Sequence, residues 1–149
     1  MALDPQTLST LEPAQFVALV KGMSDQEIRD DLAGPHRKGV LDSVFSRFPQ
    51  SFRPDKAGDR SARIDFRVTG GPGDSSDTYA VVVDHGTCRV EEGASESPDL
   101  SLVLGPAEFL KLVTGTGNPA MMFMMGKVKA SGDLGLAAGL ANWFEAPKA

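Results

Sequence analysis

The sequence of 149 residues has little cysteine and no long apolar run, and each absence excludes a class of protein. Cys88 is the only cysteine, which excludes a disulfide framework within the chain and a cysteine-rich zinc module. No stretch approaches the roughly 20 apolar residues of a membrane-spanning helix. The first five residues lack the basic and apolar regions of a secretory signal. We therefore expect a soluble, cytoplasmic protein.

An excess of positive charge is also lacking, because the formal net charge is −5. A general nucleic-acid binder is therefore not expected, since such proteins need basic residues to contact the phosphates. The chain is 41% hydrophobic and 23% charged, close to the averages of globular domains. At this length it can bury about two thirds of its unfolded surface, which is enough for one hydrophobic core.

Catalytic and metal-binding motifs are absent as well. There is no Gly-x-Ser-x-Gly motif, and the glycine-rich residues 70–73 lack the lysine and threonine of a phosphate-binding loop. His85 and Cys88 lie close together in the sequence but have no further metal ligands nearby. Asp84 with Tyr79 is a conceivable acid–base pair, although an aspartate in a turn is the ordinary interpretation. We predict no catalytic residue, no metal and no cofactor.

The first third of the sequence has the periodicity of helices. Residues 13–21 form one predicted helix, which begins at a proline and ends at Gly22. Ser24 and Glu27 form a capping box at the start of a second predicted helix, in which each residue satisfies a backbone N–H at the other. A third helix is predicted to carry the apolar residues of 40–48 and to end at Pro49.

The middle of the sequence changes to the period of two that strands show. Residues 62–68 alternate apolar and charged side chains, which predicts a half-buried antiparallel strand. Residues 84–87 predict a hairpin turn between two further strands, and residues 100–104 predict another strand. A helix over 106–113 follows, and residues 126–132 are typical of an edge strand with outward lysines. Asp133 is the predicted cap of a final helix.

Basic residues are concentrated in one stretch, where residues 35–69 carry eight bases and four acids. Two interpretations stay open for this stretch, whose bases are Arg37, Lys38, Arg47, Arg53, Lys56, Arg60, Arg63 and Arg67. It is either a solvated face paired with neighbouring acids or a surface that makes transient contact with a membrane. Cys88 alternates with Val90, which predicts a buried small hydrophobic residue and not a nucleophile.

The segment Phe123–Ala137 contains an apolar run, then Gly-Lys-Val-Lys, a short strand, Gly-Asp and a leucine-rich stretch. This segment resembles the C-terminal signature of the sterol carrier protein 2 family. The strand at 100–104, the helix at 106–113 and the hairpin at 84–86 follow the same order as in that family. The resemblance covers roughly residues 36–145.

The resemblance implies an α+β fold in which a mostly antiparallel sheet of about five strands has one face covered by helices and encloses an apolar tunnel. It further implies a domain at 36–149 and an N-terminal helical extension at 1–35 that the minimal family domain lacks. Members of the family carry fatty acids, fatty acyl-CoA, sterols or other lipids without catalysis. The last four residues depart from the peroxisomal Ser-Lys-Leu address, so the organelle assignment does not carry over.

A set of apolar residues is predicted to line the ligand site: Phe66, Phe109, Val113, Met121, Met122, Met124, Met125, Leu136, Leu140 and Trp143. Methionine adapts to ligands of varied shape, but a methionine-rich helix also fills gaps in a core, so both interpretations stay open. Lys127 and Lys129 either protect the edge strand from pairing with other chains or meet a ligand carboxylate or phosphate at the tunnel mouth.

Three functions follow as hypotheses from these observations. The first is a non-enzymatic protein that binds or carries a hydrophobic ligand such as a fatty acid, an acyl-CoA or a sterol-like molecule. The second is an accessory module of the same fold with a filled tunnel, whose N-terminal helices cover the tunnel mouth or dock a protein partner. A homodimer is a further possibility. The third is a small enzyme that acts on a hydrophobic substrate.

Overall fold

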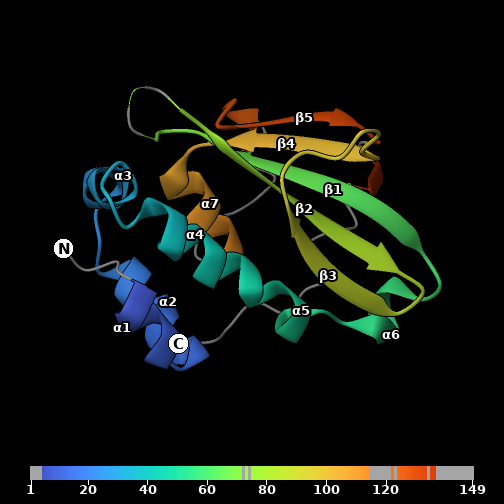
Figure 1. Ribbon diagram of the computed structural model, residues 1–149, viewed down its shortest axis with the longest axis horizontal. Coiled ribbons are helices and arrows are strands. Elements are labelled where there is room, and N and C mark those ends of the chain that lie inside the picture. The colour runs from blue at the N-terminus through green and yellow to red at the C-terminus, as the bar shows by residue number, and fades with distance from the viewer. Residues whose placement is uncertain are drawn as a thin grey trace.

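The alternating residues in the middle of the chain form a five-stranded sheet with helices against one face (Figure 1). The computed structural model describes residues 5–71, 73, 75–114, 122, 124–133, 135 and 136. The strands are β1 (Ser61–Val68), β2 (Asp77–Asp84), β3 (Thr87–Glu92), β4 (Leu100–Leu104) and β5 (Val128–Gly132). The helices are α1 (Pro5–Thr10), α2 (Pro13–Lys21), α3 (Asp25–Leu32), α4 (Arg37–Ser46), α5 (Phe48–Ser51), α6 (Pro54–Ala57) and α7 (Pro106–Thr114).

The strands lie in the order β3-β2-β1-β4-β5, so the first strand of the chain is central. β1 runs antiparallel to β2 but parallel to β4, and the other neighbours are antiparallel. The mostly antiparallel five-stranded sheet is confirmed, while the prediction of an antiparallel strand at 62–68 holds on the side of β2 only. β5 lies at an edge as predicted, with Val128 buried and Lys129 exposed.

The hairpin between β2 and β3 is confirmed at the predicted position. Asp84 pairs with Thr87, and the two residues between them have positive φ angles, 45° at His85 and 86° at Gly86. Two consecutive positive φ angles are typical of the type I′ turn, whose twist matches that of the flanking strands. The turn therefore sets the register in which β3 adds to the sheet.

The capping box before α3 is confirmed in both directions. The Ser24 hydroxyl accepts a hydrogen bond from the backbone N–H of Glu27 at 3.1 Å. The Glu27 carboxylate accepts one from the backbone N–H of Ser24 at 3.1 Å. Two of the N–H groups that a helix start leaves unpaired are thereby satisfied, which explains why the helix begins here.

The prediction that Pro49 terminates the third helix is wrong. α4 ends at Ser46, and Pro49 lies in the first turn of α5. Proline is accepted there because the first residues of a helix have no intrahelical partner for their N–H groups. Phe48 consequently belongs to α5 and not to the helix that carries Phe45.

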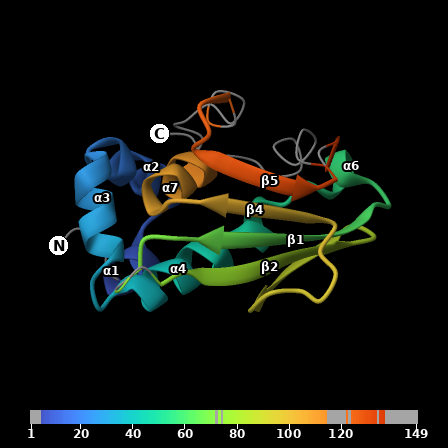
Figure 2. The ribbon, with the colours of Figure 1, turned by 90° about the horizontal axis from the view of Figure 1, so that it is seen from above.

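The helices form one layer and one cluster. α4 and α7 lie against the sheet, while α1, α2 and α3 gather beyond one of its ends (Figures 1 and 2). Five buried residues of these three helices belong to the same hydrophobic core as the strands, namely Leu8, Phe16, Val20, Ile28 and Leu32. The boundary between residues 35 and 36 stays a prediction. Among the described helices, none is long and apolar enough to cross a membrane.

Arg37 corrects the interpretation of the basic stretch as a solvated face, because its side chain is buried. Its guanidinium donates hydrogen bonds to the carboxylate of Asp77 at 2.7 Å, to the carbonyl of Leu32 at 3.0 Å and to the carbonyl of Val68 at 2.6 Å. These acceptors offset the cost of removing the charge from water. Arg37 thus joins the end of α3 to the end of β1 and the start of β2.

Candidate functional site

The face of the sheet that the helices cover, called the covered face below, is apolar along its length. Alternate residues of each strand point to this face, and on the central strands they are fully or almost fully buried. On β1 and β4 they are Ala62, Ile64, Phe66, Val68, Leu100, Leu102 and Leu104. A surface of this kind can pack against helices or against an apolar ligand, because both exclude water from it.

Five aromatic rings lie together between the covered face and α4. The ring of Phe45 is stacked on Tyr79 with 4.2 Å between centroids and on Phe109 with 4.9 Å. It also meets Phe66 edge-on at 5.9 Å and Phe48 at 5.2 Å. These separations are those of favourable aromatic pairs. The cluster brings two predicted ligand-site residues, Phe66 and Phe109, to one place.

A polar network borders the aromatic cluster at Tyr79. The Tyr79 hydroxyl donates to the Asp42 carboxylate at 2.5 Å, and the Lys38 ammonium binds both Asp42 and Glu92. Burial, followed by the hydrogen bond to Asp42, raises the pKa of Tyr79 well above its ordinary value. Tyr79 therefore keeps its proton at neutral pH, and its carboxylate partner is Asp42 instead of Asp84.

The C-terminal signature contributes to the same core. Met122, Val128 and Leu136 are buried in one hydrophobic cluster with Phe66 and Phe109. Val113, at the end of α7, is half-buried and packs against this cluster. Residues that are far apart in the sequence thus belong to one hydrophobic core.

The remaining predicted ligand-site residues divide into two groups. The side chains of Met124 and Met125 are 86% and 62% exposed. Met121, Leu140 and Trp143 lie outside the described residues. The role of each predicted residue in ligand binding stays a prediction.

Two residues of the signature have clear structural roles. Gly132 has φ 104°, and a Cβ built at this position would lie 2.4 Å from the carbonyl oxygen of Asp99. Any other residue would therefore force the backbone apart at the end of β5. The Asp133 carboxylate accepts a hydrogen bond from the backbone N–H of Leu136 at 3.1 Å, as predicted for a helix cap. The helix predicted to follow extends beyond the described residues.

The opposite face of the sheet, called the outer face, holds a buried acid that the sequence did not predict. Asp65 was expected to face water on a half-buried strand, yet only 6% of it is exposed. One carboxylate oxygen accepts from the backbone N–H of Ser95 at 2.9 Å, and the other accepts from the Ser95 hydroxyl at 2.8 Å. The segment 93–99 folds back over the outer face, which is why Asp65 is covered.

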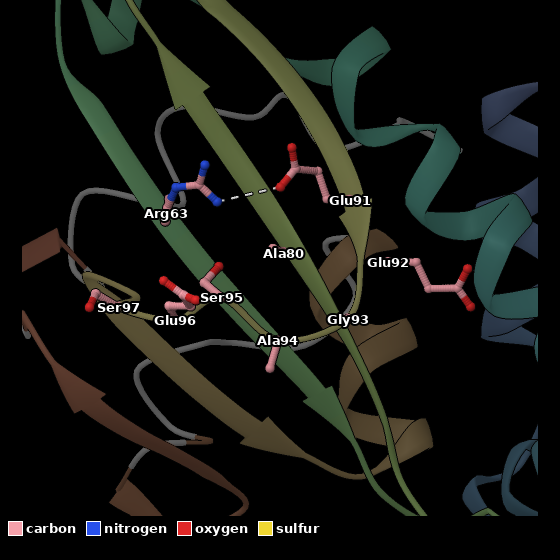
Figure 3. Close-up of a pocket in the computed structure, with 9 residues that line it drawn as sticks. All are labelled: Arg63, Ala80, Glu91, Glu92, Gly93, Ala94, Ser95, Glu96 and Ser97. Carbon is pink, nitrogen blue, oxygen red and sulfur yellow. Dashed lines mark hydrogen bonds and ion pairs between the residues drawn. The ribbon is translucent and has the colours of Figure 1, made fainter.

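A surface hollow of about 480 Å³ lies beside this segment (Figure 3). Its lining is polar and includes Arg63, Glu91 and Glu96. Arg63 of β1 and Glu91 of β3 form an ion pair at 3.4 Å that spans the intervening strand β2. The hollow does not match an apolar ligand, since it would leave these charged groups without water.

Cys88 is half-buried against the core, and burial raises the pKa of its thiol to about 11. The thiol therefore carries its proton at neutral pH and is a poor nucleophile. Among the residues that the structure describes, no three side chains of the kinds that bind metals gather in one place.

The fold and the covered face define a class of protein: an α+β domain whose sheet shelters an apolar interior under helices. A profile of the SCP-2 sterol transfer family matches residues 45–145. The chain belongs to this family.

Curated relatives match a shorter part of the chain. "Sterol carrier protein 2" of Homo sapiens is 36% identical over 77 residues, which are 52% of this chain and 14% of that protein. The protein of the same name in Gallus gallus is 34% identical over 77 residues, again 52% and 14%. The matched part is therefore a small fraction of the length of these relatives.

Solved structures share the fold. The crystal structure of sterol carrier protein 2 like 2 from Aedes aegypti has a TM-score of 0.56 at 20% identity and covers 71% of this chain and 94% of that one. Part of the sec-alkylsulfatase Pisa1 from Pseudomonas sp. has a TM-score of 0.62 at 15% identity, covering 71% of this chain and 16% of the enzyme. Identities this low establish the fold alone.

Proposed function

We propose that the chain binds and carries a hydrophobic small molecule, such as a fatty acid, an acyl-CoA or a sterol-like lipid, without catalysis and in the cytoplasm. The observation that carries this proposal is that Met122 and Leu136 of the C-terminal signature belong to the same apolar core as Phe66 and Phe109. A ligand beside this cluster gains on the order of 0.8 kcal/mol for each CH₂ that it buries. Family membership supports the same function.

The proposed wall of the site combines rigid and adaptable side chains. Phe66 and Phe109 are held by aromatic neighbours, so they offer a fixed surface. Met122 is unbranched and can adjust to ligands of different shape. We include Val113, Met121, Leu136, Leu140 and Trp143 in this proposal. The side chains of Met124 and Met125 are exposed, and the matched variants below test whether they join the wall. A solved structure of palmitated SCP2L2 from Aedes aegypti is in keeping with a fatty acyl ligand. It has a TM-score of 0.53 at 21% identity and covers 68% of this chain and 87% of that one.

Displacement of a fluorescent fatty acid from the purified chain tests the proposal, with native mass spectrometry to identify what co-purifies. We expect saturable binding of the probe and its displacement by unlabelled fatty acid or acyl-CoA. A chain that carries no lipid and takes up no probe would contradict the proposal. We also expect no turnover of acyl-CoA or lipid esters, because the described Tyr79 and Cys88 both keep their protons at neutral pH.

Two matched variants locate the site. Met122→Gln places an amide in the buried cluster and is expected to weaken probe binding about ten-fold or more, since an unpaired polar group opposes an apolar ligand. Met124→Gln makes the same chemical change on an exposed side chain and is expected to leave affinity unchanged. Equal losses in both variants would place Met124 in the wall as well.

A second candidate function is an accessory module with a filled interior. The packing of Phe45 against four aromatic rings favours it, because it leaves no room for a ligand among those rings. A chain of this kind would retain a protein partner or a second copy through its N-terminal helices and would fail to bind the fluorescent fatty acid. The displacement experiment therefore separates the two functions.

A further inference from the structure

Two neighbouring methionines stand out on the surface just before β5. Over the residues that the structure describes, Met124 and Met125 are the large hydrophobic side chains that are exposed. They lie two and three residues after the buried Met122, at the turn that leads through Gly126 into the edge strand. Two adjacent exposed methionines cost free energy in water unless something covers them.

Lysines flank these methionines. Lys127 and Lys129 are exposed, and neither forms an ion pair with a carboxylate in the described part of the chain. The ion pair of Lys111 with Asp25, at 2.6 Å, lies nearby. Lys111 lowers the pKa of Asp25 by hydrogen bonding, and Lys127 adds to the shift through its charge. Two lysines, Lys111 and Lys127, therefore act on the carboxylate of Asp25, on a helix that also carries Glu27, Asp30 and Asp31.

Two acids lie at the other edge of the sheet. Glu91 and Glu92 are on β3, and the strand order places β3 four positions from β5. Four spacings of about 4.8 Å separate the two edges by roughly 19 Å. This separation exceeds the Debye length of about 8 Å at physiological salt, so a surface that meets the start of β5 is screened from the acids on β3.

We propose that the turn with Met124, Met125 and Lys127, together with Lys129 at the start of β5, docks the chain on an anionic lipid bilayer. These four residues are called the Met–Lys turn below. Apolar side chains that enter the headgroup region, beside cations that face anionic headgroups, are the two contributions that hold peripheral proteins at membranes. Half of the eight bases in the stretch at 37–67 are engaged within the chain, because Arg37 is buried and Lys38, Arg53 and Arg63 are paired with acids. Lipid carriage, as proposed above, gives the docking its biological purpose, but the argument for docking uses only the surface residues.

Co-sedimentation with vesicles tests the docking. We expect the chain to bind phosphatidylcholine vesicles that contain about 30 mol% phosphatidylglycerol, and to bind pure phosphatidylcholine much less. Lys127→Glu is expected to weaken binding at least about five-fold. Lys56→Glu, an equal change of charge on the exposed α6, is expected to change it less than about two-fold. Failure to bind anionic vesicles, or equal effects of the two variants, would overturn the proposal.

The methionines need a measurement of their own. In a Cys88→Ala background, an environment-sensitive dye on Met125→Cys is expected to shift to the blue when anionic vesicles are added. The same dye on Lys56→Cys is the control and should not shift. A Met124→Ser/Met125→Ser variant should bind vesicles several-fold more weakly while its circular dichroism stays native. Equal dye responses at both positions would show that the Met–Lys turn does not enter the bilayer.

The same variants separate this proposal from the function proposed above. Without vesicles, the Lys127→Glu variant should bind the fluorescent fatty acid with the same affinity as the parent chain. A chain that binds fatty acid but not vesicles would overturn the docking alone. A chain that binds vesicles through the Met–Lys turn but takes up no fatty acid would overturn ligand carriage alone.

Discussion

The two faces of the sheet are buried by different physical means. The covered face is closed by apolar side chains, with Phe45 in contact with four rings. The outer face is covered at Asp65 by the segment 93–99, which is held by two hydrogen bonds from Ser95. The covered face therefore depends on volume and shape, whereas this part of the outer face depends on particular donors and acceptors.

This difference teaches where each face can tolerate change. An apolar core accepts a side chain of similar size but loses contacts when a cavity is made. A buried carboxylate accepts no replacement that leaves its donors unpaired. We expect the covered face to respond most to lost volume and the outer face most to lost hydrogen bonds.

The largest expected effect is on the covered face. Phe45→Ala should lower the free energy of unfolding by about 3–5 kcal/mol, because it removes the ring at the centre of the aromatic cluster. Val103→Ala, a smaller truncation of a partly exposed residue on the outer face, should cost less than about 1 kcal/mol. Urea denaturation measures both values. Similar losses in the two variants would contradict the contrast between the faces.

A smaller effect is expected at the buried acid. Asp65→Ala should lower the free energy of unfolding by about 2 kcal/mol, since the Ser95 N–H and hydroxyl lose their acceptors. Hydrogen exchange at Ser95 should also become faster, because the segment 93–99 is released. Arg67→Ala, on the same face of the same strand but exposed, is the control and should change stability by less than about 0.5 kcal/mol. Unchanged hydrogen exchange at Ser95 in Asp65→Ala would show that Asp65 does not hold the segment 93–99 in place.

The smallest effect is expected outside both faces, where Lys111 joins α7 to Asp25 of α3. The hydrogen bond from Lys111 lowers the pKa of Asp25 in the folded chain, so its contribution to stability is present above the unfolded pKa of about 4. This contribution is lost as the pH falls through the lower folded value. Both side chains are about one-third exposed, so solvent screening keeps it near 0.5 kcal/mol.

Asp25→Asn should therefore reduce stability at pH 7 by about 0.5 kcal/mol and have no effect near pH 2. Thermal unfolding across this pH range measures the difference between the variant and the parent chain. Asp30→Asn, an exposed acid on the same helix, provides the comparison. A difference that persists unchanged at pH 2 would show that the charge of Asp25 is not its cause.

Features that depend on neighbours in the sequence were predictable. The capping box of Ser24 and Glu27, the turn at His85 and Gly86, and the edge strand with Lys129 outward all follow from local spacing. Helix caps and two-residue turns require particular residue types within a few positions of each other. The resemblance in the segment 123–137 then predicted which elements would come together.

Features that depend on distant residues were not predictable. Asp65 and Ser95 are 30 positions apart, and no periodicity in either segment shows that they meet. Arg37 looked like a member of a solvated basic stretch, but its acceptors come from α3, β1 and β2. A charge can be buried only where several elements bring hydrogen-bond acceptors to the same place. The composition and the hydrophobic periodicity of the sequence do not predict where these elements meet.

The methionines show the same division within one short segment. The sequence by itself determined that apolar, adaptable side chains would gather just before the edge strand. Only the tertiary structure decided that Met122 enters the core whereas Met124 and Met125 face the surface. The physical reason is that the position of the turn against the sheet determines which of these side chains are buried. Packing between elements that are distant in the sequence sets this position.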